Sequence, residues 1–188
     1  MNDTLKNSAS FLFDIVKLTL ISLLIIIPIR TFVVQPFFVK GQSMLPSFHD
    51  GEYLIIDEIS YRFQEPKRGQ VVVFKNPQNP DQYYIKRIIG LPGEKVEVEN
   101  GRVIIYNQQN PAGKILEEDP YLPNTSTPGN IKQILEGDEY FLLGDNRHSS
   151  FDSRRFGAVE EELIVGKVLF RAWPFERARA FSHPEYSY

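Results

Sequence analysis

The feature that most constrains this chain is an uncharged, apolar stretch close to its N-terminus. From Leu18 to Ile29 the sequence runs for 12 residues without an acidic or basic side chain. At about 1.5 Å per residue, that length is too short to cross roughly 30 Å of hydrocarbon. Extending the stretch to 15–34 gives 20 residues and adds only two charged residues, Lys17 and Arg30, whose long side chains can reach the membrane interface. The sequence therefore predicts a transmembrane helix over about 15–34.

Three interpretations of this stretch compete. A buried core helix would carry a polar stripe at helical spacing, whereas this stretch is apolar on every side. A cleavable targeting signal would be followed by small residues, but bulky residues predominate over 30–37. We therefore expect a permanent anchor in the lipid bilayer, within an N-terminal segment over 1–36. Cations are equally numerous on the two sides of the span, so their count does not give its orientation.

Beyond residue 37 the pattern changes to short segments rich in β-branched and aromatic residues, separated by Pro, Gly and Asn. Such segments are typical of strands bounded by turns. A hairpin is expected over 95–106, because Asn100-Gly101 supplies a tight turn between two alternating runs. No βαβ alternation is visible, so we expect a mostly β domain over 37–180. Further strands are predicted at 52–56, 70–74, 83–89, 139–143 and 163–171.

One part of this domain breaks the strand pattern. Residues 107–130 contain four prolines among Asn, Thr and Gly, which predicts a long, irregular surface excursion. A single helical turn is expected directly after it, at 131–135.

Composition and charge exclude several classes of function. The 188 residues accommodate one domain plus the appended segment. A net charge of −3 gives no electrostatic case for binding nucleic acid. Cysteine is absent, which excludes disulfides and thiol-rich metal sites. The three histidines lack metal-ligand spacing, so we expect neither a metal nor another cofactor.

A turn of small residues, Gly41-Gln42-Ser43-Met44-Leu45-Pro46, follows the apolar stretch. Its serine would lie just outside the bilayer surface. Serines before prolines are also common in ordinary turns, so the turn alone does not establish a functional site.

The predicted strand over 83–89 carries two adjacent cations, Lys86 and Arg87. Alternation places Tyr84, Lys86 and Ile88 on one face and Arg87 on the other. Neither face is polar throughout, so one of the two cations must lie against apolar surroundings. Burial lowers the pKa of a lysine, and a neutral lysine can activate a hydroxyl. The alternative is that Lys86 extends to water and only borders the sheet.

The segment from Gly144 to Arg154 is more polar than a turn requires. Asp152 and Arg154 are two residues apart, so in an extended chain they project to one side and can pair. Ser150 or Ser153 can donate a hydrogen bond that orients a neutral lysine. The simpler alternative is a turn closed by Asp and Asn.

Taken together, these segments resemble the bacterial type I signal peptidases, the leader peptidase family. Each motif is weak alone, but four of them in this order after an apolar stretch are specific, and the match spans roughly 30–175. The four are Ser43-Met44-Leu45-Pro46, Arg68-Gly69-Gln70-Val71-Val72-Val73-Phe74, Tyr84-Ile85-Lys86-Arg87-Ile88-Ile89-Gly90-Leu91-Pro92-Gly93-Glu94, and Gly144-Asp145-Asn146-Arg147 through Ser150 to Arg154.

The resemblance implies a membrane-bound serine endopeptidase with Ser43 as nucleophile and neutral Lys86 as general base. Its single-pass anchor would lie in the cell membrane, with the β-rich catalytic domain on the extracytoplasmic face. The implied partners are exported preproteins, whose signal peptides are cut off after small residues at Ala-x-Ala-like sites. The apolar residues at 37–39 and 84–88 would wall the substrate pockets. The backbone N–H of Ser43 would stabilise the oxyanion.

The resemblance also assigns supporting roles. Ser150 matches the serine that hydrogen-bonds the lysine, Asp152 and Arg154 match a salt bridge that supports the site, and Asp145 belongs to the same loop. The chain departs from some relatives at Gly41, where the family can place a hydroxyl donor two residues before the nucleophile. A glycine has no such side chain, so the second oxyanion donor would be backbone or water.

Lesser departures are Gln70, where an acidic residue is frequent, and His148 in the last motif. A related fold, the self-cleaving repressor, would need a DNA-binding module where the apolar stretch lies. The alternative from another class is a non-catalytic, membrane-tethered β-domain that binds a partner protein. Such a domain would have no use for Ser43 and Lys86 together.

Overall fold

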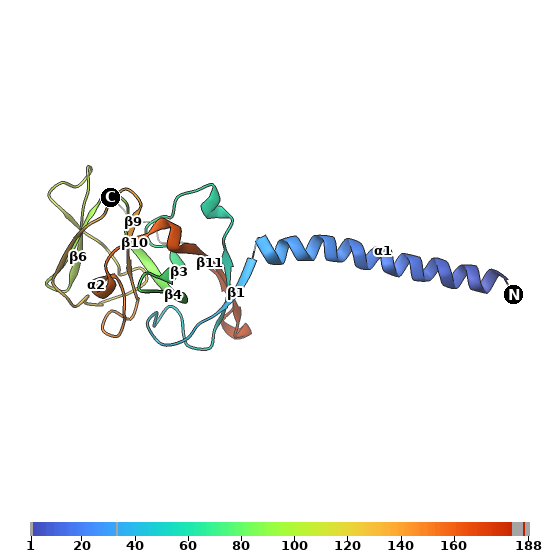
Figure 1. Cartoon of the computed structure of the whole chain (residues 1–188). Helices are drawn as coiled ribbons and strands as arrows, with labels where there is room; N and C mark the ends of the chain where they lie inside the picture. Colours follow the sequence, from blue (N-terminus) through green and yellow to red (C-terminus); the bar gives the residue numbers. More distant parts are fainter. Residues whose placement is uncertain (1, 33, 182–185, 187–188) are drawn as a thin grey trace.

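The computed structural model describes residues 2–32, 34–181 and 186. One long helix, α1 (Asn2–Phe32), lies outside a β-rich body (Figure 1). The expectation of a mostly β fold is confirmed. Among the described residues, no helix is both long enough and apolar enough to cross a bilayer. The predicted span over 15–34 includes residue 33, which lies outside the described residues.

The described part of the body forms two antiparallel sheets. The larger follows the order β1-β2-β11-β3-β4-β9-β10, with β12 paired to β11, and the smaller follows the order β7-β6-β5-β8. The strands are β1 (Val34–Phe38), β2 (Tyr53–Asp57), β3 (Val71–Asn76), β4 (Asn79–Gly90), β5 (Lys95–Glu99), β6 (Arg102–Tyr106), β7 (Lys114–Ile115), β8 (Ile131–Ile134), β9 (Glu139–Leu143), β10 (Val159–Glu160), β11 (Ile164–Trp173) and β12 (Arg179–Ala180). The short helices are η1 (Ser60–Arg62), α2 (Ser153–Phe156), η2 (Glu161–Leu163) and η3 (Phe175–Arg177).

The strands predicted from sequence are all present, with shifts of a few residues at most bounds. β2, β3, β4 and β11 overlap the predicted ranges, and β9 has the predicted bounds. The predicted hairpin is β5 and β6. Its turn residues Asn100 and Gly101 have φ values of 51° and 78°, the left-handed conformation that such a tight turn requires.

The helical turn expected at 131–135 is wrong. Residues 131–134 form β8, which pairs antiparallel with β5 and sets Gln133 opposite Val96. The apolar spacing of Ile131, Ile134 and Leu135 fits one helical turn, but β5 offers an unpaired edge, and backbone pairing with it prevails. The preceding segment, 107–130, is irregular as expected, and β7 is its one short strand among the described residues.

Buried apolar side chains join the sheets and hold the segment that precedes β2. One cluster includes Val96 of the smaller sheet and Phe141 of the larger, so the two sheets share a core. A second cluster places Met44 and Phe48 against Ile56 and strands β3 and β11. Burying side chains of this size contributes roughly 1.5–3 kcal/mol each. The turn that carries Ser43 is therefore anchored to the core.

Candidate active site

Ser43 lies on the turn between β1 and β2, next to the buried side chain of Met44. The N–H of Gly41 donates to Asp50 Oδ1 at 2.6 Å, which ties the start of the turn to its end. Gly41 has a φ of 87°, a conformation that glycine adopts without strain. The hydroxyl of Ser43 is thus presented from a fixed turn.

Lys86 lies on β4, between β3 and β9, and is only 3% exposed. Its Nζ lies 2.8 Å from Ser43 Oγ and 2.8 Å from the carbonyl oxygen of Ile85. It forms no ion pair with any described carboxylate. Burial lowers the pKa of Lys86 to about 8, and the charges of Asp152 and Asp145 offset part of that shift.

The neighbouring cation, Arg87, is buried as well. The sequence required burial of at least one of the two cations, and the structure buries both. Arg87 Nε and Nη2 donate to Asp145 Oδ1 and Oδ2 at 2.8 and 2.6 Å. Its guanidinium carbon lies 4.1 Å from the ring centroid of Tyr121. The two adjacent cations therefore differ in kind: Arg87 has a counter-ion, and Lys86 has a hydroxyl.

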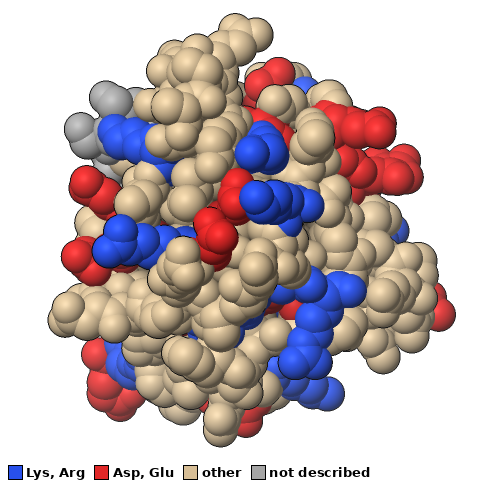
Figure 2. Space-filling model, turned by 90° about the vertical axis from the view of Figure 1, so that its left-hand side faces the viewer, with Lys and Arg blue, Asp and Glu red and all other residues tan. Residues whose placement is uncertain are grey.

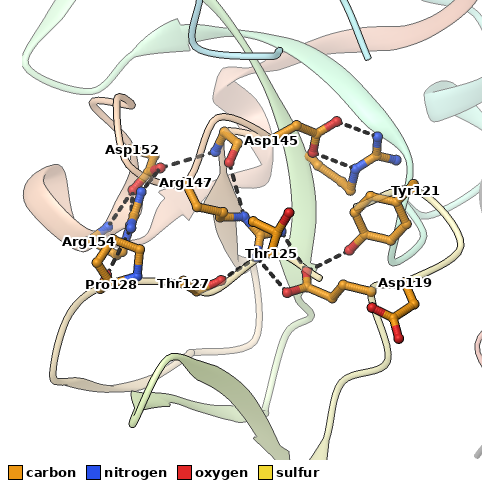
Figure 3. Close-up of polar contacts among 12 residues, drawn as sticks. Asp119, Tyr121, Thr125, Thr127, Pro128, Asp145, Arg147, Asp152 and Arg154 are labelled. Carbon is orange, nitrogen blue, oxygen red and sulfur yellow. Dashed lines mark hydrogen bonds and ion pairs between the residues drawn. The ribbon is translucent and has the colours of Figure 1, made fainter. Parts of the chain in front are cut away.

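Asp152 and Arg154 form the expected ion pair (Figure 3), with Arg154 Nη2 2.7 Å from Asp152 Oδ2. The backbone between them is not the extended chain that we expected. Asp152 is the N-cap of α2 and accepts the N–H of Arg154, which lies inside the helix rather than in extended chain. Asp152 Oδ2 also accepts the N–H of Gly144 at 3.1 Å, so the pair closes the loop that follows β9.

The excursion at 107–130 is fastened to this loop (Figure 3). Arg147 is 2% exposed, and its Nη1 and Nη2 donate to the two carboxylate oxygens of Glu118 at 2.5 and 2.6 Å. Arg147 Nη1 also donates to Thr127 Oγ1, and Arg154 Nη1 donates to the Pro128 carbonyl. Sequence reasoning missed Arg147 and Glu118, because nothing local marks partners that lie 29 residues apart.

Asn146 is a third residue that sequence reasoning missed. Its N–H donates to the Ser43 carbonyl at 3.0 Å, and its Nδ2 donates to the Gln42 carbonyl at 3.0 Å. Two consecutive carbonyls at the serine are therefore held by one asparagine. The only signal for it was its place in the Gly144-Asp145-Asn146-Arg147 motif.

The remaining serines of the loop have different surroundings. Ser153 Oγ accepts the N–H of Leu142 at 2.9 Å. Ser150 Oγ is buried and has no hydrogen-bond partner among the described residues, so its expected bond to Lys86 is not formed and its role stays a prediction. A Cβ on Gly144 would lie 2.1 Å from Ser150 Oγ and 2.5 Å from the Ser43 carbonyl oxygen. Only glycine fits at this position without displacing one of them.

Ser43 and Lys86 lie in the wall of a cavity of about 300 Å³. Phe37 and Tyr83 also line it, with ring centroids 5.6 Å apart. Residues 37–39 and 84–86, which we expected to wall the substrate pockets, line this cavity, and its use by substrate stays a prediction. Ile88 instead lies wholly in the core.

This arrangement can activate a hydroxyl. A neutral amine at 2.8 Å can accept the Ser43 proton, and both groups face a cavity that a ligand can enter. Within the described residues, no cluster of His, Asp or Glu side chains is suited to holding a metal ion. The class of protein that fits this geometry is a serine hydrolase.

Comparison with known proteins gives the family. A family model described as "Signal peptidase, peptidase S26" matches residues 12–173. Signal peptidase IB of Staphylococcus aureus (strain Mu50) is 37% identical over 179 residues, covering 88% of this chain and 91% of the relative. Signal peptidase I of Leptolyngbya laminosa is 36% identical over 180 residues, covering 92% and 85%. A crystal structure of a signal peptidase I from Enterococcus faecalis V583 is 32% identical with a TM-score of 0.47, over 55% of this chain and 97% of that chain. The chain belongs to the signal peptidase family, peptidase S26, a family of serine peptidases.

Proposed function

We propose that this chain is a membrane-bound serine endopeptidase that removes N-terminal signal peptides from exported preproteins, with Ser43 as nucleophile and Lys86 as general base. The observation that carries the proposal is the 2.8 Å contact between Ser43 Oγ and the Nζ of a buried lysine. Because the pKa of Lys86 is lowered to about 8, a useful fraction of this amine is neutral near physiological pH.

The chemistry follows from that contact. Neutral Lys86 takes the proton from Ser43 as the hydroxyl oxygen attacks the scissile carbonyl, and a tetrahedral oxyanion forms. The resulting ammonium gives its proton to the leaving amine, which is the new N-terminus of the mature protein. A water molecule, deprotonated by the same lysine, then hydrolyses the acyl-enzyme and releases the signal peptide.

The backbone N–H of Ser43 is proposed as an oxyanion donor. It has no acceptor among the described residues, so it is available to substrate. The N–H of Gly41 is already bonded to Asp50, and glycine has no side-chain donor. In such a site one donor is worth about 3 kcal/mol of barrier.

The loop from Gly144 to Arg154 is proposed to hold Ser43 and Lys86 in place. The ion pair of Asp152 and Arg154 fixes the Gly144 N–H, and Asp145 holds the strand through Arg87. Ser150 is assigned to Lys86, because its buried hydroxyl has no other partner among the described residues.

The substrate and location are proposed on similar grounds. An apolar cavity of about 300 Å³ beside Ser43 suits small side chains ahead of the scissile bond. The apolar side chains of 11–26 in α1 are largely exposed, and lipid would cover them in a single-pass anchor. The body would then lie on the extracytoplasmic face of the cell membrane, where exported preproteins emerge.

The test is cleavage of a preprotein with an Ala-x-Ala site by the full chain in detergent micelles. The wild type should cut after the second alanine, and Ser43→Ala and Lys86→Ala should lose at least a thousandfold in rate. Ser149→Ala and Lys75→Ala are matched controls, since both residues are exposed and outside the cavity. Folded Ser43→Ala that cuts at the wild-type rate would place the nucleophile elsewhere.

A further inference from the structure

A second, larger cavity lies away from the Ser43 cleft. It has a volume of about 640 Å³ and is bounded by the 64–71 segment, by β11 and by the 120–121 part of the excursion. The proposed catalytic pair does not line it. The proposed function leaves this cavity without a role.

The charged lining of this cavity is of one sign. Among its described lining residues there is no Asp or Glu, and the cations are Lys67, Arg87, Lys167 and Arg179. The surface at the end of the molecule facing away from α1 is different, because basic and acidic side chains lie side by side there (Figure 2).

Two of these cations are neutralised by carboxylates that do not line the cavity, and two are not. Asp145 pairs with Arg87, and Asp57 lies 3.5 Å from Lys167. Lys67 and Arg179 have no carboxylate within ion-pair distance among the described residues. The cavity therefore keeps about two uncompensated positive charges, which concentrates anions inside it.

Gln70 adds a neutral donor to the same wall. Its Oε1 accepts the Lys67 backbone N–H at 2.9 Å and the Tyr61 hydroxyl at 2.6 Å. A backbone N–H can only donate, so this contact fixes which end of the amide is the oxygen. Gln70 Nε2 has no acceptor among the described residues and remains available to a ligand.

We propose that this cavity binds an anion that carries a phosphate-type group, held by Lys67, Arg179 and Gln70 Nε2. Each of these groups donates and none accepts, and an arginine fork matches the oxygens of a phosphate. A lipid headgroup and a free phosphate share this chemistry. The cavity also borders Ser47, four residues after Ser43, so it reaches the segment that carries the proposed nucleophile.

The test uses the full chain in zwitterionic detergent micelles and substitutes Gln70→Glu. Glutamate keeps the acceptor for Tyr61 and the Lys67 N–H but replaces the free donor with a negative oxygen. Inorganic phosphate, titrated by calorimetry at constant ionic strength, should bind the wild type saturably and bind Gln70→Glu at least tenfold more weakly. Gln108→Glu makes the same charge change at an exposed position outside the cavity and should bind as the wild type does.

A second arm distinguishes the source of the anion. Thermal unfolding midpoints are compared in phosphatidylcholine nanodiscs with and without phosphatidic acid. If phosphatidic acid raises the midpoint of the wild type but not of Gln70→Glu, and raises it more than inorganic phosphate does, the ligand is a lipid headgroup. If inorganic phosphate gives the larger rise, the ligand is a free phosphate. Lys67→Gln, at an exposed position, serves if Gln70→Glu does not fold. Equal responses of the wild type and both variants to both probes would overturn the proposal.

Discussion

Replacing Lys86 with methionine should stabilise the folded protein at pH 7 and destabilise it above pH 10.5. Because burial lowers the pKa of Lys86 from 10.5 to about 8, protonating it costs the folded state about 3 kcal/mol relative to the unfolded chain. Methionine has a similar length and no charge, so it removes this cost. It also loses the contacts with Ser43 Oγ and the Ile85 carbonyl, at about 1 kcal/mol each. At pH 7 the net result is a gain of about 1 kcal/mol.

The pH window follows from the two pKa values. Below about 8 the lysine is protonated in both states, and the full cost is present. Between about 8 and 10.5 the unfolded chain holds the proton and the folded chain does not, so wild-type stability rises with pH. Above 10.5 the cost is gone, and Lys86→Met should be less stable than the wild type by about 2 kcal/mol.

The assay is guanidinium unfolding of the full chain in micelles between pH 7 and 11, followed by the fluorescence of its one tryptophan, Trp173. Comparing Lys86→Met with the wild type at each pH cancels the pH-dependent changes that the two chains share. Lys75→Met, at an exposed position on β3, should show a difference that does not vary with pH. A Lys86→Met difference that is also constant across this range would refute a depressed pKa.

Three further substitutions test the supporting structure. Gly144→Ala should lower kcat at least tenfold with little change in KM, because its Cβ would meet the Ser43 carbonyl oxygen at 2.5 Å; steady-state kinetics decide this. Asn146→Asp should lower kcat about tenfold (~1.4 kcal/mol), since the carboxylate keeps the shape but cannot donate to the carbonyl before Ser43; a rise confined to KM would contradict this. Arg147→Met should cost about 3 kcal/mol of unfolding free energy by leaving the half-buried Glu118 carboxylate without its cation; adding Glu118→Gln should restore part of it.

The strands were predictable because their signal is local. A β-branched run bounded by Pro or Gly, or an Asn-Gly turn at 100–101, needs no distant partner to be recognised. The helical turn at 131–135 failed for the opposite reason. The extended conformation of residues 131–134 depends on pairing with the edge of β5, some 35 residues away in the chain.

The candidate site, too, was predictable only where its signal is local or carried by a motif. Alternation along β4 separated Lys86 from Arg87 but did not reveal what covers either face, and both proved to be buried. The motif order supplied the pairing of Ser43 with Lys86 across 43 residues, which periodicity alone does not reach. Asn146 and the ion pair that fastens the excursion went unpredicted, because such contacts exist only once the sheets have assembled.

The most direct test of the central claim is the pH dependence of kcat/KM for a preprotein with an Ala-x-Ala site. If neutral Lys86 is the base, kcat/KM should rise with pH and level off, with an apparent pKa of about 8. A rise centred near 10.5, the ordinary value for lysine, or a profile flat from pH 6 to 11 would contradict the assignment of Lys86 as the base.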